Sequence, residues 1–217
     1  MTNQYSSIMC AINPMKRQRD ESLTNTPKRA RNMMKAPPRE INSHDYLMSI
    51  SKNRVVRSTE IKNFFHTFTE SELEAYGSTV TSAIRSRNLE QVERLHKEGQ
   101  TFQCSNRFGE SIIHMACRQG CYEVVNFLLK EAKVSLKIKD DYGRTPLHDA
   151  FWSATPNFEL VNLLLEECPS LLFMTDKRGH APLQYARVEH HSSWIKFLQE
   201  RENLIRKGIE DLDEAIV

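Results

Sequence analysis

Four segments of the chain follow one pattern, and their spacing constrains the fold more than any other feature. Aligned on Ala83, Ala116, Ala150 and Ala186, the segments lie 33, 34 and 36 residues apart. In each, an apolar stretch around the alanine precedes a second apolar stretch. A period in this range predicts stacked helix–turn–helix units. A single unit cannot bury its own apolar face, so neighbouring units must pack on one another.

The third unit holds the clearest version of the pattern, DYGRTPLHDA at residues 141–150. Gly143 permits the positive φ that the tip of a β-turn needs. The hydroxyl of Thr145 can cap a helix, and Pro146 fits the first helical turn because its missing N–H costs nothing there. Leu147 is then expected to point into the core. Each residue of the string therefore has a mechanical role in a turn followed by a helix.

This string resembles the ankyrin-repeat signature, and the resemblance covers about residues 76–205. It implies an all-α fold, a solenoid of about four helix–turn–helix repeats, in which the motif histidine His148 hydrogen-bonds within its hairpin. The amino-acid sequences of the units are also similar to those of microalgal ankyrin-repeat proteins. Helix pairs are expected at 79–98, 111–130, 145–167 and 181–200, with turn tips near Gly109, Gly143 and Gly179.

The outer units depart from the signature. The first has lost the Thr-Pro-Leu-His string, as expected of a terminal repeat. The fourth has Ala181 in place of the threonine and Gln184 in place of the histidine. We place the repeats at 76–205 and a C-terminal tail at 206–217.

Residues 44–75 are predicted to form a helical lead-in that caps the stack. Ser58 could cap one helix, and Thr69 followed by Glu72 reads as a capping box for another. The aromatic residues between them are expected to bury most of their area against the first repeat; they are Phe64, Phe65 and Phe68.

Residues 1–43 are predicted to be a disordered basic tail. They hold eight basic and three acidic side chains, a balance of +5, whereas the whole chain has +2 and the remainder therefore −3. Four of the eight prolines lie here, and apolar periodicity is missing, so too little surface can be buried to offset chain entropy.

Two basic clusters in this tail have the form of a bipartite nuclear import signal, consisting of Lys16, Arg17, Lys28, Arg29 and Arg31. We expect a nuclear protein, otherwise a cytoplasmic one, and an import receptor as one partner. Thr26 before Pro27 resembles a kinase site, where a phosphate would oppose the adjacent cations. A solvated charge run with no receptor remains the alternative.

Other classes of function are less favoured. The sequence has no continuous apolar run of about 18 residues, so we expect no membrane span. Its cysteines, odd in number, are interpreted as free thiols of an intracellular protein. His114, Cys117 and Cys121 suggest a metal site, but zinc sites normally show two tight ligand pairs. His148 and Asp149 are adjacent on a helix and cannot face each other. We predict no enzyme, no cofactor and no metal.

The favoured function is a protein–protein interaction adaptor, expected to be monomeric. The resemblance implies binding through the turn tips and the concave side of the first helices. By alignment these positions are Arg107, Phe108, Glu110 and Arg118; Asp141, Tyr142, Arg144 and Trp152; then Lys177, Arg178, His180 and Glu189. Exposed Tyr, Trp and Arg are enriched where binding energy concentrates, although Phe108 and Tyr142 could equally pack against neighbouring turns. The alternative is a nucleic-acid-associated nuclear regulator that acts through the tail.

Overall fold

A computed structural model describes residues 41–61 and 63–216. The tail expected at 1–43, with its import signal and Thr26, lies outside these residues except for 41–43. In chain order the elements are α1 (Ser43–Ile50), β1 (Val56–Arg57), α2 (Glu70–Glu74), α3 (Ser78–Arg85), α4 (Leu89–Lys97), α5 (Ile112–Gln119), α6 (Tyr122–Lys130), α7 (Pro146–Phe151) and α8 (Phe158–Glu167). They continue with η1 (Pro169–Phe173), β2 (Met174–Thr175), η2 (Pro182–Tyr185), η3 (Val188–His190), α9 (His191–Gln199) and α10 (Glu202–Ile216).

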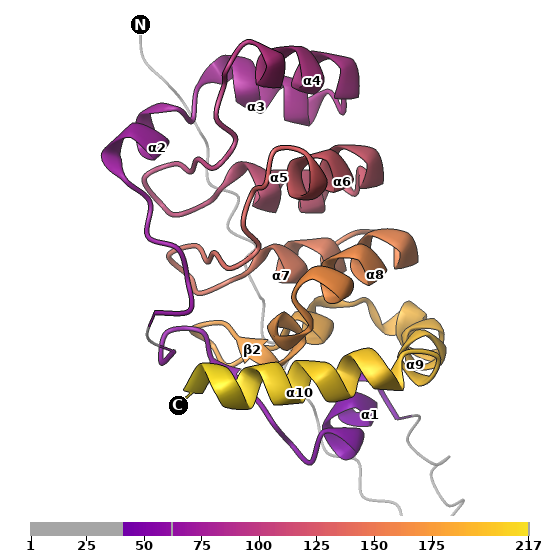
Figure 1. The fold of residues 1–217 in the computed structure, drawn as a ribbon. Helices are drawn as coiled ribbons and strands as arrows, with labels where there is room; N and C mark the ends of the chain where they lie inside the picture. The colour runs from indigo at the N-terminus through magenta and orange to yellow at the C-terminus, as the bar shows by residue number, and fades with distance from the viewer. Residues whose placement is uncertain (1–40, 62, 217) are drawn as a thin grey trace, which may run out of the picture. The chain divides into compact units, whose positions relative to one another are not determined.

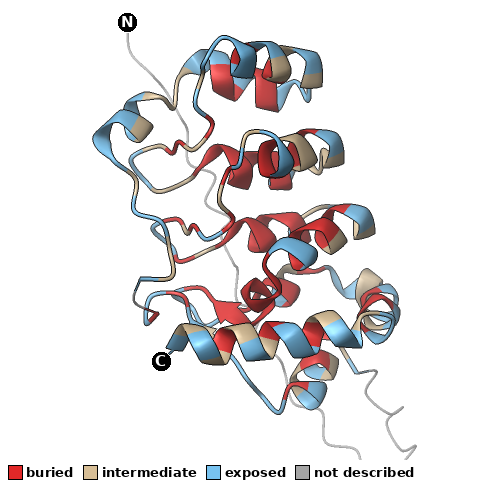
Figure 2. Cartoon of the chain, in the orientation of Figure 1, coloured by how far each residue is buried: buried red, intermediate tan, exposed pale blue. Residues whose placement is uncertain are grey.

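Helix pairs α3/α4, α5/α6 and α7/α8 stack one above the next (Figure 1), which confirms the predicted all-α solenoid. The predicted turn tips are also confirmed, since Gly109, Gly143 and Gly179 all have positive φ. Leu147 is fully buried, in agreement with the register. Buried residues gather on the helix faces that meet between the pairs (Figure 2), so the core runs along the stack.

The fourth unit departs from the expected helix pair at 181–200. Its first helix is reduced to the short 3-10 turn η2, because Ala186 already has an extended backbone (φ −67°, ψ 142°). Ala181 also lacks the hydroxyl with which Thr145 interacts with His148 in the third unit. The chain passes through η3 before α9 forms the regular second helix.

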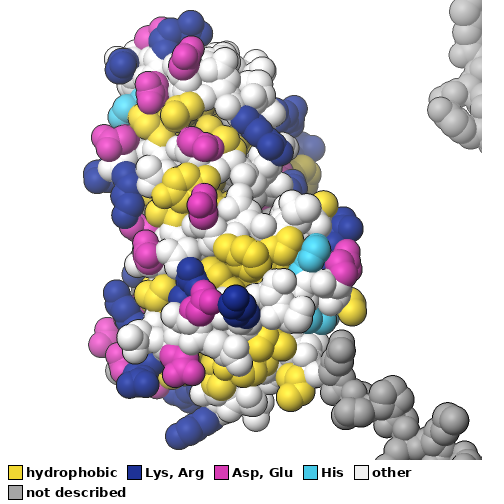
Figure 3. Space-filling view, turned by 90° about the vertical axis from the view of Figure 1, so that its right-hand side faces the viewer, with side chains coloured by type: hydrophobic (Ala, Val, Ile, Leu, Met, Phe, Trp, Pro, Cys, Tyr) yellow, Lys and Arg dark blue, Asp and Glu magenta, His cyan; other side chains and the backbone are white. Residues whose placement is uncertain are grey.

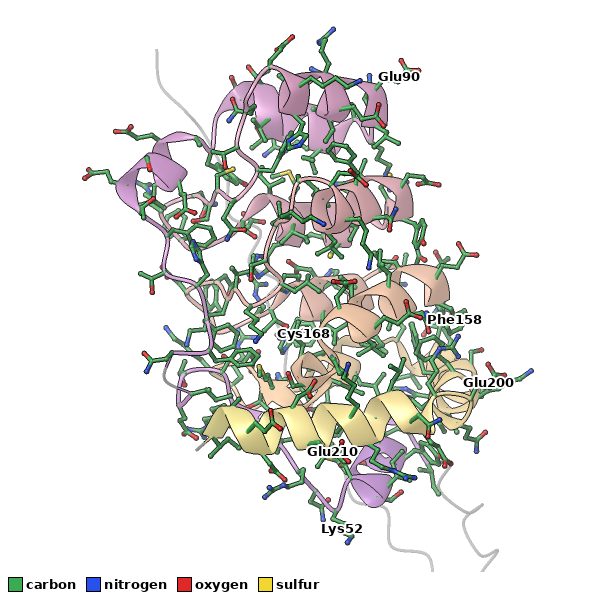
Figure 4. All side chains as sticks on the ribbon, viewed as in Figure 1. Lys52, Glu90, Phe158, Cys168, Glu200 and Glu210 are labelled. Atoms are coloured by element: carbon green, nitrogen blue, oxygen red, sulfur yellow. The ribbon has the colours of Figure 1, made fainter. Side chains whose placement is uncertain are left out.

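Residues 206–216 are not a tail, because they belong to helix α10. Leu212 is fully buried, and α10 packs along η1 (Figure 1). Gly208 permits this approach: a Cβ atom there would lie 2.7 Å from the carbonyl oxygen of Pro169. Cys168, labelled in Figure 4, is buried where the chain passes from α8 to η1.

The lead-in follows a different course from the one expected. Only α1 and α2 are helical within 41–61 and 63–75, and α1 packs against α9 and η2, at the opposite end of the stack from the first repeat. Strand β1 then pairs in parallel with β2, with Val56 opposite Met174. Ser58 caps no helix. The capping box of Thr69 and Glu72 at α2 is confirmed.

The aromatic residues of the lead-in, Phe64, Phe65 and Phe68, do bury most of their area and pack against the core, but not at the place expected. Lys137 Nζ lies 4.8 Å from the ring centroid of Phe64, and Lys139 Nζ lies 4.7 Å from that of Phe65. These lysines belong to the segment that leads into the third repeat, so two of the three aromatic residues contact that repeat rather than the first. The helical pattern did not reveal this, because an extended segment that crosses the repeats has no period of its own.

Candidate partner-binding surface

An acidic or amide side chain holds each of the three hairpin tips rigid. Asp140 Oδ1 accepts hydrogen bonds from the backbone N–H groups of Tyr142 (2.9 Å) and Arg144 (2.8 Å). Asp176 does the same for the fourth unit, and Asn106 for the second. The side chains that project from these tips therefore start from a fixed backbone.

The tips are also bonded to one another. The backbone N–H of Asp141 donates to the carbonyl oxygen of Phe108, and that of Lys177 to Tyr142, each at 2.9 Å. These hydrogen bonds hold the tips of successive repeats side by side, so that the tips form one continuous edge. Such preorganised surfaces lose less entropy on binding than mobile loops do.

The motif histidines bond beyond their own hairpins. Nδ1 of His148 accepts from the backbone N–H of Thr145, and its Nε2 lies 3.1 Å from the carbonyl oxygen of His180 in the next repeat. His114 reaches Arg144 in the same way, at 3.0 Å. The expected bond within the hairpin thus describes half of the arrangement. Burial lowers the pKa of His148 to about 4, which keeps the ring neutral.

Most of the residues predicted to form the surface are exposed, and Glu110 and Arg144 are half-buried. Three large apolar or aromatic side chains stand out, since Phe108, Tyr142 and Trp152 keep 55%, 61% and 59% of their area exposed. Arg107 lies over the ring of Phe108 at 4.9 Å, and Arg144 over that of Tyr142 at 5.2 Å. Both rings therefore project from the tips rather than filling the core.

A pocket of about 710 Å³ brings half of the predicted residues together at the junction of the third and fourth repeats. Its predicted lining residues are Tyr142, Arg144, Trp152, Lys177, Arg178 and His180. Four further lining residues were not predicted from the sequence: Asp176, Gln184, Tyr185 and Arg187. Repeat alignment offered a signal for them, because all four lie in the same tip and first-helix segment of the fourth repeat.

Tyr185 lines the pocket and contacts three other side chains. Its hydroxyl donates to Asp176 Oδ2 at 2.7 Å, and its ring lies 5.5 Å from that of Trp152 and 5.3 Å from that of His148. Burial would raise the pKa of Asp176, but the hydrogen bonds from Tyr185 and from two backbone N–H groups lower it. Asp176 is therefore a carboxylate whose charge is already satisfied within the chain.

The other predicted surface residues lie outside this pocket. Arg118 is bound to Glu110 (2.7 Å) and to Asp149 (3.0 Å), while Glu189 lies 3.7 Å from Arg187. The face shown in Figure 3 carries separated apolar groups among charges of both signs. On this face, charges of the two signs are mixed, and no patch of a single charge suggests a second binding site.

The residues considered for metal binding and catalysis are engaged elsewhere. Both ring nitrogens of His114 have hydrogen-bond partners, and burial raises the pKa of the Cys117 thiol well above its usual value. Asp149, beside His148, pairs with Arg118. Across the described part of the chain, no three His, Cys, Asp or Glu side chains form a group that could hold a metal ion. The cysteines described there are free thiols.

No helix among the described residues is both long and apolar enough to cross a membrane.

A "Putative glutaminase 2" of Caenorhabditis elegans is 33% identical to this chain over 71 residues. The match covers 33% of the chain but spans only 12% of the length of that relative. Residues 81–170 match the family model of ankyrin repeats in three copies. Ankyrin repeats generally mediate protein–protein interaction, and residues 81–170 of this chain are ankyrin repeats.

Proposed function

We propose that the chain is a protein-interaction adaptor whose partner binds the tips and first helices of the third and fourth repeats. The observation that carries the proposal is the pocket at this junction, where predicted tip residues from both repeats converge. Tyr, Trp and Arg side chains gathered in a pocket are the groups in which binding energy concentrates at protein interfaces. We assign no enzymatic activity to the chain.

Two aromatic side chains supply the anchors. Tyr142 and Trp152 are more than half exposed, and both belong to the pocket wall. Large exposed aromatic groups lose much hydrated area when a partner covers them, and they carry a large share of the energy in typical interfaces. The bonded tips hold Tyr142 in place before the partner arrives, and Trp152 is held at the end of α7, where its backbone N–H donates to the carbonyl oxygen of His148.

A pull-down with the tagged full chain, followed by mass spectrometry, tests the proposal. The partner captured by the unmodified chain should be lost with Tyr142→Ala combined with Trp152→Ala. The matched control replaces exposed apolar residues elsewhere, Ile50→Ala with Leu73→Ala, and should retain the partner. Thermal melting of each variant checks the fold. Capture that survives the first pair but fails when residues 1–43 are removed would assign binding to the tail and defeat the proposal.

The charge of the tail favours a second candidate, a nucleic-acid-associated nuclear regulator. Eight basic against three acidic side chains in 1–43 would attract a phosphate backbone independently of base sequence. Such binding should weaken steeply as salt is raised. A salt titration with duplex DNA, with and without residues 1–43, tests it: the same weak binding by both chains would remove this candidate.

A further inference from the structure

The junction between the second and third repeats is closed by an ion triad. Arg118, at the end of α5, places one guanidinium nitrogen 2.7 Å from Glu110 at the tip and 3.0 Å from Asp149 of α7. The three charges satisfy one another across the repeat boundary. A partner that reached this position would have to displace an existing carboxylate.

The same positions one repeat further along hold different chemistry. By alignment on the repeat alanines, Glu110 and Arg118 correspond to Arg144 and Trp152, and Asp149 corresponds to Tyr185. All three replacements line the 710 Å³ pocket. The tip carboxylate is thus replaced by a cation, and the bridging guanidinium by an exposed indole. The junction between the second and third repeats is therefore closed by ion pairs, whereas the junction between the third and fourth repeats is open.

Two cations of the pocket have no counterion among the residues that the structure describes. Arg144 pairs with Asp140, and Arg187 lies 3.7 Å from Glu189. Within 41–61 and 63–216, no carboxylate lies within 4.0 Å of the charged groups of Lys177 or Arg178. Asp176 is held by the Tyr185 hydroxyl and by backbone N–H groups instead. The pocket therefore has positive charge that remains to be matched.

We propose that this pocket binds an acidic side chain, Asp or Glu, which the partner presents beside an aromatic or aliphatic residue. The carboxylate pairs with Lys177 and Arg178, and the apolar neighbour packs on Trp152. This inference rests on the proposed function and names the chemistry of its partner. Charge complementarity of this kind selects partners and speeds their encounter.

A nucleic-acid backbone fits the pocket less well. Its cations are interleaved with acids, since Asp141 lies at the adjacent tip, Asp176 lines the pocket and Glu189 pairs with Arg187. A run of phosphates would meet these acids as well as the cations. A single carboxylate can occupy the space between the two unmatched cations without such repulsion.

Fluorescence anisotropy with labelled peptides tests the inference on the full chain. The probe is the peptide EEFEE, with QQFQQ and EEAEE as matched peptides. EEFEE should bind about tenfold more tightly than either, which corresponds to about 1.4 kcal/mol. Equal binding of QQFQQ would overturn the role of charge, and equal binding of EEAEE that of the apolar neighbour. Displacement of EEFEE by single-stranded DNA at lower concentration than by unlabelled EEFEE would also overturn the proposal.

Charge-removing variants locate the site. Lys177→Gln with Arg178→Gln should weaken EEFEE binding by about tenfold, whereas Lys97→Gln with Lys196→Gln removes two exposed cations outside the pocket and should change it by less than about twofold. All four positions are exposed, so the fold should persist, and thermal melting checks this. An equal loss of EEFEE affinity in the two variants would contradict the inference. If the Tyr142 and Trp152 variant loses the captured partner while EEFEE does not bind, the inference fails and the adaptor function stands.

Discussion

The hydroxyl of Ser58 donates a hydrogen bond to the carbonyl oxygen of Gly143 at 2.6 Å, although 85 residues separate the two in the chain. The backbone N–H of Ser58 also donates to Thr175, and Lys139 Nζ donates to the carbonyl oxygen of Ser58. Ser58 is fully buried. The lead-in is thus an integral part of the third and fourth repeats rather than a separate preceding segment.

Removal of the lead-in should therefore destabilise the repeats. A chain that begins at Ser71 loses α1, β1 and the bonds of Ser58, and it uncovers the edge of β2. Its melting temperature should be lower than that of a chain that begins at Asn42, which keeps all of these contacts. Equal melting temperatures in calorimetry would show that the docked lead-in adds nothing to stability.

Leu147→Ala should lower the free energy of unfolding by about 2–5 kcal/mol, the usual range for truncation of a buried leucine. Leu147 is fully buried in the first helix of the third repeat. Urea denaturation measures the change, with Leu73→Ala as an exposed control. Similar losses in both variants would contradict the assigned register.

Gly208→Ala should destabilise the chain even though alanine favours helices. A Cβ atom at this position would meet the Pro169 carbonyl oxygen at 2.7 Å, and backbone atoms cannot move aside as a flexible side chain can. Overpacking of this kind costs about 1–3 kcal/mol. Lys207→Ala, exposed on the same helix, is the control and should change stability by less than about 0.5 kcal/mol. A Gly208→Ala chain more stable than the parent would mean that α10 does not pack this closely.

Stability should fall as the pH drops from about 6.5 toward 4. Burial lowers the pKa of His148 from 6.5 to about 4, so the unfolded chain takes up a proton in this interval while the folded chain does not. The expected loss from this group is about 3 kcal/mol. His148→Gln should remove this contribution, because glutamine does not titrate and Gln184 already fills the equivalent position in the fourth repeat. Unfolding by urea at several pH values checks it; identical pH dependence in both chains would refute the assignment.

Replacement of Lys28, Arg29 and Arg31 by alanine should move a fluorescent fusion of the full chain out of the nucleus. The two basic clusters on an extended chain would otherwise each meet an acidic groove of the import receptor. The tag must be large enough to prevent passive entry, and replacement of Lys52, Arg54 and Arg57 is a control with equal charge change. An unchanged distribution would remove the nuclear interpretation.

The sequence alone determined the repeats and their register, because turn and helix chemistry is local. Gly143 at the tip, the buried Leu147 and the capping box at Thr69 each depend on neighbours a few residues away, and all three were predictable. Within the candidate site, the alignment likewise identified Tyr142 and Trp152, since a repeated backbone places equivalent positions on the same face.

Tertiary structure alone decided what depends on contacts between distant segments. The path of residues 51–61 is set by the paired β2 edge and by the bonds of Ser58, and neither leaves a periodic trace in the sequence. Whether a repeat junction is open or closed depends on three side chains from two repeats meeting in space. Arg118 closes one junction with Glu110 and Asp149, whereas Trp152 beside Tyr185 leaves the next one open. The physical reason is that pairing of charges and rings across a boundary is fixed by distance in three dimensions, which local sequence patterns do not encode.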